Sequence, residues 1–185
     1  MRKLLMVFAL VALPATASAQ EYPVDRGSMV LGGSVSWTSS GGDLYENSDG
    51  DRLNSLLLNP EVMYFVMPGL AIGGELYVER ASQGDFDATT IAVGPQISYY
   101  FGGPTSSVYP FLSAMVGYAD MSSDAFDASG LAFGFTGGAA FMLSRSVALT
   151  AGATYQLQNL SVDQLDESVD GNAFALQLGV QAFLY

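Results

Sequence analysis

Apolar residues alternate with small or polar residues along the stretch 130–158. Leu131 and Phe133 fall on one face of an extended chain, and Ala132 falls on the other. Successive side chains of a strand point to opposite faces, so a period of two predicts two strands joined by a turn at 144–146. Each arm exceeds ten residues, which is the length of a tilted strand that crosses a membrane.

Six further stretches alternate in the same way, so the sequence predicts eight strands. Their ranges are 29–39, 54–66, 70–80, 89–101, 108–118, 130–143, 147–158 and 173–185. The connections are short at 67–69, 102–107 and 144–146, and longer and acidic at 40–52, 81–88, 119–129 and 159–172. Short turns at one end and longer loops at the other are typical of outer-membrane barrels. The predicted fold is an all-β, eight-stranded antiparallel up-and-down transmembrane β-barrel.

The two faces of these strands differ in chemistry. Leu, Ile, Val, Phe and Tyr gather on one face, and Gly, Ser, Thr, Ala and Gln on the other. In the stretch 108–118 the facing is ambiguous, and we expect Leu112 and Val116 outside with Ser113 and Gly117 inside. A soluble lipocalin-like barrel also alternates, but its polar face meets water and needs charge. The nearly uncharged strands favour lipid outside and a narrow polar interior.

Outward aromatic residues are expected at two depths. Those near the short turns are Tyr64, Tyr99, Phe101 and Phe141, and those near the longer loops are Trp37, Tyr118, Tyr155 and Phe174. Two aromatic belts at the membrane interfaces are typical of a lipid-embedded barrel. The alternative is that aromatic residues simply favour strands.

Residues 1–19 have the pattern of a secretory signal peptide. Two basic residues precede an apolar run at 4–13, and small residues offer a cleavage site near Ala19. The apolar run is too short to span a bilayer as a helix. The remaining segment, 20–185, is predicted to be one outer-membrane β-barrel domain.

The charge of this segment is strongly negative. All 18 acidic residues follow Ala19, but only four of the six basic residues do, so the net charge after cleavage is 4 − 18 = −14. This surface repels nucleic acid and favours divalent cations or cationic partners. The chain has no cysteine, so disulfides do not stabilise it, whereas a closed and fully hydrogen-bonded barrel would.

Several motifs carry a resemblance to a known family. They are LGGSVSW at 31–37, LNPEVMYFVMPGLAIGGEL at 58–76, VGPQISYYF at 93–101 and the aromatic C-terminus. Together they resemble the small OmpA/OmpX-type outer-membrane β-barrel family over essentially all of 20–185. The resemblance implies a location in the bacterial cell outer membrane and insertion by the barrel-assembly machinery. It also implies a structural, adhesive or defensive role.

One detail departs from that family. Its C-terminal signal places a terminal aromatic residue in phase with the outward side chains, yet Phe183 and Tyr185 share the phase of the inward Gln181. Either the last strand shifts its phase near the end, or Leu184 serves as the outward terminus.

The sharpest candidate for chemistry is a pair of interior carboxylates. A turn centred on Pro68 places Glu61 opposite Glu75. Two charges about 4 Å apart repel by about 4 kcal/mol at an effective dielectric near 20, so the pair is expected to share a proton, bind a cation or meet Arg26 or Arg145. We expect an interior polar network that fills the lumen, with acid–base chemistry or gating as alternatives. Its predicted members are Glu61, Glu75, Glu79, Asn59, Tyr77, Gln96 and Gln156.

The acidic loops carry weaker signals. The stretch 46–51 resembles part of a calcium loop but lacks the downstream glutamate, so we predict a solvated loop. The acidic groups at 120–127 and 163–170 are also interpreted as solvated faces. The alternative is weak divalent-cation sites that bridge lipopolysaccharide phosphates.

The sequence excludes some enzyme classes. It contains no histidine, which rules out Ser–His hydrolysis and disfavours His-dependent acyl transfer. We predict no catalytic, metal or cofactor site, and a monomer in contact with outer-membrane lipids and lipopolysaccharide. The predicted function is non-enzymatic: acidic surface loops serve adhesion or envelope integrity. The alternatives are a narrow channel for ions or small solutes and, ranked last, a lipid-active enzyme.

Overall fold

The alternating stretches all form strands. The computed structural model describes residues 22–40, 51, 53–123, 127–162 and 167–185, so the predicted signal segment 1–19 lies outside the described residues. The strands are β1 (Met29–Ser40), β2 (Leu53–Met67), β3 (Leu70–Gln83), β4 (Phe86–Tyr100), β5 (Val108–Ser123), β6 (Asp127–Met142), β7 (Val147–Val162) and β8 (Glu167–Leu184). Within the described ranges no helix is long and apolar enough to cross a membrane.

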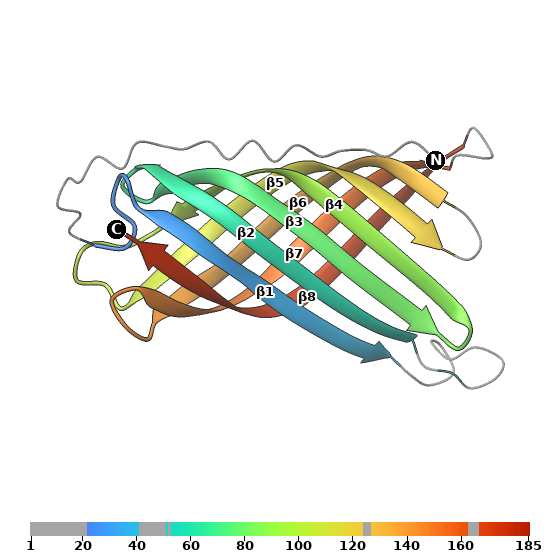
Figure 1. Ribbon diagram of the computed structural model, residues 1–185, viewed down its shortest axis with the longest axis horizontal. Helices are drawn as coiled ribbons and strands as arrows, with labels where there is room; N and C mark the ends of the chain where they lie inside the picture. The colour runs from blue at the N-terminus through green and yellow to red at the C-terminus, as the bar shows by residue number, and fades with distance from the viewer. Residues whose placement is uncertain (1–21, 41–50, 52, 124–126, 163–166) are drawn as a thin grey trace.

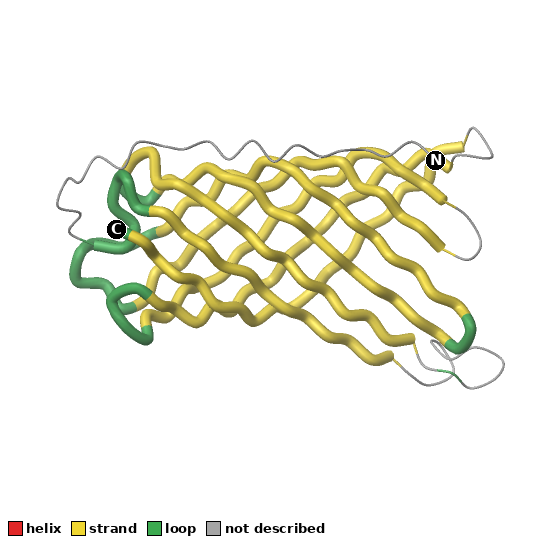
Figure 2. The backbone as a smooth tube through the Cα atoms, viewed as in Figure 1, coloured by secondary structure: helices red, strands yellow, loops and turns green. Residues whose placement is uncertain are grey.

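The eight strands close into one barrel. Each strand pairs antiparallel with its neighbours along the chain, and β8 pairs with β1. Figures 1 and 2 show the strands tilted around the barrel, with the C-terminus at the same end as the turns that follow β2, β4 and β6. The predicted antiparallel up-and-down topology is confirmed.

The apolar face of the strands points away from the barrel interior. Leu112 is 59% exposed and Phe135 is 51% exposed, whereas Ala132 on the opposite face is fully buried. In β5, Val116 is exposed and Gly117 is buried, so the expected facing of that strand is confirmed. Monomeric soluble proteins rarely expose so continuous an apolar surface. Acyl chains are therefore the medium that fits the outer wall.

The strands reach further into the acidic stretches than the alternation predicts. The predicted loop 81–88 is wrong, because β3 and β4 continue until only Gly84 and Asp85 separate them. Gly84 has a φ of 59°, a left-handed conformation that a two-residue hairpin requires and that glycine adopts at little cost.

The predicted acidic loops at 119–129 and 159–172 are also largely strand, with only 124–126 and 163–166 between strands. The predicted loop at 40–52 lies mostly outside the described residues. Beyond the lipid, water accepts polar side chains on both faces of a strand, while the backbone groups still gain by pairing. The hydrophobic alternation therefore ends before the hydrogen-bonded ladder does.

We call the end of the barrel that contains Gly84 the extended end, and the end with the turns after β2, β4 and β6 the short-turn end. The short-turn end is sealed from inside. Aromatic and aliphatic side chains fill the lumen there as a plug. Its buried members are Val24, Val30, Met63, Phe65, Ala71, Tyr100, Tyr109, Phe111, Ala140, Ala148 and Phe183. The rings of Phe65 and Tyr100 lie 5.5 Å apart, and those of Tyr100 and Phe111 lie 5.3 Å apart, within the range of favourable aromatic pairs.

The segment before β1 covers this plug. The Gly27 N–H donates to the Phe65 carbonyl at 2.9 Å, and the Gly69 N–H donates to the Val24 carbonyl at 2.8 Å. The Val24 side chain is fully buried against the plug. These bonds tie the segment to β2 and to the turn between β2 and β3, so it lies across the short-turn end (Figure 1).

The phase of the last strand is now defined. Phe183 is 1% exposed and packs inside the barrel, whereas Leu184 is 50% exposed on the outer wall. The strand therefore keeps its phase to its end, and Leu184 is the outward terminus. The Tyr185 hydroxyl donates to the Arg145 carbonyl at 2.9 Å, which fixes the last residue against the turn between β6 and β7.

Candidate functional site

A polar layer crosses the lumen above the plug. On its other side lies a second apolar layer, in which Tyr77 is the one ring among mostly small side chains: Leu57, Tyr77, Ala92, Ala119, Ala128, Ala132 and Leu160. A polar layer enclosed between two apolar layers is poorly hydrated, so each of its groups needs a partner from the protein. This layer is the candidate site.

The two interior glutamates lie opposite each other in the strand register, as predicted. Glu61 and Glu75 are register partners on β2 and β3. The turn differs in one detail, because Met67 pairs with Leu70 after an irregularity that follows Phe65. The irregularity lies below the pair, so the register that brings the two carboxylates together is kept.

Amide groups, rather than guanidinium groups, donate to these carboxylates. Gln181 Nε2 on β8 donates to Glu61 Oε1 at 2.7 Å, and Asn59 Nδ2 donates to Glu75 Oε1 at 2.5 Å. Arg26 is exposed in the segment before β1, and Arg145 is exposed in the turn between β6 and β7. We expected one of these arginines to contact the pair, but no described hydrogen bond joins either arginine to Glu61 or Glu75.

The third interior glutamate belongs to a separate cluster. Glu79 accepts from the Ser55 hydroxyl at 2.6 Å through one oxygen, and from the Tyr77 hydroxyl at 2.6 Å through the other. Both carboxylate oxygens of Glu79 therefore have donors. The pair at Glu61 and Glu75 has no such complete set among the described contacts.

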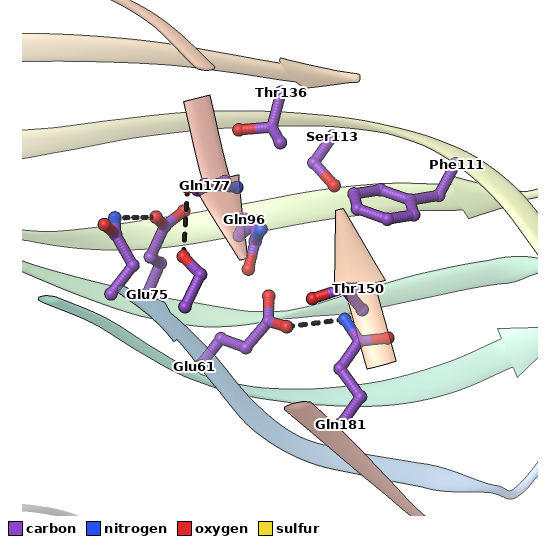
Figure 3. Close-up of a pocket in the computed structure, with 12 residues that line it drawn as sticks. Glu61, Glu75, Gln96, Phe111, Ser113, Thr136, Thr150, Gln177 and Gln181 are labelled. Atoms are coloured by element: carbon purple, nitrogen blue, oxygen red, sulfur yellow. Dashed lines mark hydrogen bonds between the residues drawn. The ribbon is translucent and has the colours of Figure 1, made fainter. Parts of the chain in front are cut away.

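A small cavity lies beside the pair. It offers about 20 Å³ of free space, roughly the room that one water molecule needs. Figure 3 shows Gln96, Thr150 and Gln181 around Glu61. The full lining is Gly33, Ser34, Asn59, Glu61, Glu75, Gln96, Phe111, Ser113, Thr136, Thr150, Gln177 and Gln181.

Three amide oxygens of residues that line this cavity lack a donor. The amide oxygens of Asn59, Gln96 and Gln181 are buried and have no hydrogen-bond partner. Each of these residues is less than 10% exposed. Nitrogen atoms of Asn59 and Gln181 already donate to the carboxylates, so turning either amide would sacrifice a strong bond. The cavity is therefore rich in unpartnered oxygen.

The remaining predicted network members are divided between regions. Gln156 is buried at 3% exposure, but its described partner is Gln158, whose Nε2 donates to it at 3.5 Å. Gln96 lines the cavity, while Tyr77 lies in the second apolar layer and bonds to Glu79. The seven residues thus all face the interior, but the structure groups them as two clusters and one separate glutamine.

The predicted belt residues lie on the outer wall. Tyr64 is half-buried, and the other seven are exposed: Trp37, Tyr99, Phe101, Tyr118, Phe141, Tyr155 and Phe174. Near the short turns Tyr99 and Phe101 contact edge to face, with ring centroids 4.8 Å apart. Their depth in a membrane stays a prediction.

The described acidic residues of the extended end do not form a metal cluster. Among the described residues, no three His, Cys, Asp or Glu side chains gather to hold an ion. Asp127 accepts from the Ser122 hydroxyl, and Asp170 accepts from the Asn159 amide. The calcium-like stretch lies outside the described residues except for Asp51.

Sequence reasoning included the donor Asn59 but missed the donor Gln181 and the plug. Gln181 is 120 residues from Glu61 along the chain, and only closure of the barrel brings β8 against β1 and near β2. The inward phase of β8 was visible in the sequence and could have identified Gln181 as a network member. Nothing in the alternation of one strand gives its distance to a strand that is not its neighbour along the chain.

Comparison with known proteins agrees with this architecture. A family model described as outer membrane protein beta-barrel domain matches residues 5–181. Neisserial surface protein A is similar in structure, with a TM-score of 0.59 and 19% identity over 84% of this chain and 96% of that one. The outer membrane protein OprG from Pseudomonas aeruginosa aligns with a TM-score of 0.60 and 11% identity, over 89% of this chain and 99% of its own.

The N-terminal β-barrel domain of Pseudomonas aeruginosa OprF is also similar, with a TM-score of 0.54 and 11% identity over 86% of this chain and 98% of that one. No curated protein matches the sequence. At these identities the structural likeness establishes the fold alone, while the family model covers most of the chain. The chain belongs to the outer membrane protein beta-barrel domain family, and its barrel lies in the bacterial outer membrane.

Proposed function

We propose that this protein is a non-enzymatic membrane anchor that presents an acidic surface for adhesion or envelope integrity. The observation that carries the proposal is the separation of charge between the two ends. At the extended end, the described residues Asp85, Asp87, Asp120, Asp127 and Asp170 are all exposed. Exposed arginines occur at the other end, at 26 and 145.

The one described basic side chain at the extended end is already paired. Arg80 donates to Asp87 at 3.2 Å, and both side chains are more than half exposed. The remaining carboxylates leave this end negative. Such a surface attracts divalent cations and cationic partners through long-range fields. Bridging of lipopolysaccharide phosphates by divalent cations is the interaction that we expect there, with the chain working as a monomer inserted by the barrel-assembly machinery.

A variant with reduced negative charge tests this role, because five substitutions change the net charge of 20–185 from −14 to −9. The five exposed aspartates are replaced by asparagine, and Glu79→Gln serves as a control that removes one interior charge. We expect cells with the five-asparagine variant to admit more of a hydrophobic dye than wild-type cells, and to attach less to a cationic surface. In both respects they should resemble cells that lack the protein. The control should behave as the wild type. Wild-type dye exclusion and attachment in the five-asparagine variant would overturn the proposal.

A narrow channel is the second candidate function. The carboxylates beside the cavity favour cations in the lumen, but the aromatic plug lies between the cavity and the short-turn end. We therefore expect the wild type to show no steady conductance in planar bilayers, and removal of plug side chains by Phe65→Ala with Phe183→Ala to create it. Steady wild-type conductance that Glu61→Gln and Glu75→Gln reduce would favour the channel instead.

A lipid-active enzyme ranks last. The chain lacks histidine, the usual general base beside a serine nucleophile. Incubation with lipopolysaccharide or phospholipid should give no turnover above that of a heat-unfolded sample.

A further inference from the structure

We propose that the interior layer binds one dehydrated Ca²⁺-class cation between Glu61 and Glu75, with the Gln96 amide oxygen as a further ligand. The site is distinct from the acidic surface, because it lies in the barrel lumen between two apolar layers. It therefore stands or falls independently of the proposed surface role.

Charge is the first step of the argument. Two carboxylates line a cavity of about 20 Å³, and its lining contains no lysine or arginine. The described donors to the pair are neutral amides, which support a carboxylate but do not cancel its charge. Uncompensated charge inside a protein is strongly destabilising unless the group is paired or coordinates a metal. A bound cation supplies the missing charge.

Unpartnered oxygen is the second, independent step. Gln96 is 7% exposed, and its Oε1 has no hydrogen-bond partner. Figure 3 shows this oxygen pointing toward the Glu61 carboxylate. The Gln96 side chain also hydrogen-bonds to Glu61, which only its amide nitrogen can do as a donor, so its oxygen stays available as a ligand beside that carboxylate. These neutral donors leave the charge of the pair unchanged.

The ligand chemistry selects the ion. Carboxylate oxygens and Asn or Gln carbonyls are the ligands that Ca²⁺ takes, in flexible geometry. One oxygen of each carboxylate already accepts an amide N–H, so the second oxygen of each glutamate and the Gln96 oxygen are the three candidate ligands, and the cavity has room for about one water molecule. Mg²⁺ usually keeps several waters, which this space does not hold. The double negative charge of the pair also matches a divalent ion better than a monovalent one.

Metal content of the refolded protein tests the site. Protein is folded into detergent micelles with CaCl₂, passed over a chelating resin and analysed for calcium by mass spectrometry. We expect the wild type to retain about one Ca²⁺ per chain more than Glu61→Gln/Glu75→Gln. Glu79→Gln should retain as much as the wild type, because Glu79 already has two hydroxyl donors. Folding of each variant is checked by its gel mobility before and after boiling.

A second variant separates ligation from charge. Gln96→Leu removes the amide oxygen and keeps both carboxylates, so it should release Ca²⁺ at least tenfold faster than the wild type. It also decides the matter if the double variant does not fold. Equal Ca²⁺ retention in all variants would mean surface binding only and would overturn the proposal. A wild type without calcium, but with the infrared band of a protonated carboxylic acid, would overturn it in favour of a shared proton.

Discussion

The two ends of the lumen are built from the same alternation but are filled differently. At the short-turn end the inward positions carry large rings, such as Phe65, Tyr100 and Phe111, which pack as a plug. At the extended end they carry mainly alanines, with Leu57, Leu160 and a single ring, Tyr77, among the buried described residues. Alternation therefore decides which way a side chain points, whereas the size of the inward residues decides where the interior is solid. We infer that packing energy is concentrated at the short-turn end.

Truncation of a plug residue should give the largest effect. Phe65 is fully buried, so Phe65→Ala should lower the free energy of unfolding by about 3–5 kcal/mol through lost transfer and cavity terms. Urea unfolding in lipid vesicles measures this value. Leu57→Ala, at the extended end, should cost less. The reverse order would break the comparison between the two ends.

A charge on the outer wall should have the next largest effect. Phe133 lies on the outer face of β6, and Phe133→Arg should cost about 2–4 kcal/mol if it lies near the middle of the bilayer. Asp127, on the same strand at the extended end, should accept arginine at a cost of about 0–1 kcal/mol. The free energies of unfolding of both variants in lipid vesicles would show where along β6 the lipid ends. Equal losses of free energy would contradict the interpretation that the extended end of β6 lies in water.

Close strand packing should produce a smaller effect. A Cβ added at Gly94 would lie 2.0 Å from the Val116 carbonyl oxygen, whereas one added at Gly103 meets nothing within 4 Å. Gly94→Ala must therefore shift the backbone of β4 or β5 and should cost about 1–3 kcal/mol, as overpacking does. Gly103→Ala is the matched control and should fold with wild-type stability in the same urea titration.

The smallest effect is expected at the extended end. The Arg80–Asp87 pair is exposed, and exposed pairs typically contribute about 0.2–1 kcal/mol. Arg80→Ala should lower the free energy of unfolding by an amount within that range. The difference from the wild type should shrink in 1 M salt, because screening weakens the pair. A change that is large and independent of salt would show that this end also carries packing energy.

Much of the fold was predictable from local pattern. The strands, their facing and the opposition of Glu61 and Glu75 all follow from the period of two and from one short turn. The strand ends did not follow, because polar residues around the hairpin at Gly84 continue the ladder without any hydrophobic signal. The plug was missed as a unit because its members come from several strands and from the segment that contains Val24.

The candidate site also has a part that the sequence predicts and a part that it does not. The carboxylate pair depends on contacts between adjacent strands, which sequence register can supply. Its donor Gln181 and the unpartnered Gln96 oxygen depend on the closure and width of the barrel, which no single hairpin contains. The charge of the pair alone predicts a shared proton, a bound cation or a nearby arginine, whereas the closed barrel places amide donors beside it.

The seam between the first and last strands sets an upper limit for the hydrocarbon on that side. β1 and β8 are paired from Met29↔Leu184 to Val35↔Leu178, and above this point each described strand continues with a neighbour on its other side only. Backbone groups without partners are costly in oil but are readily hydrated in water. The acyl region should therefore end close to Val35, which leaves Trp37, two residues higher, at the level of the lipid headgroups.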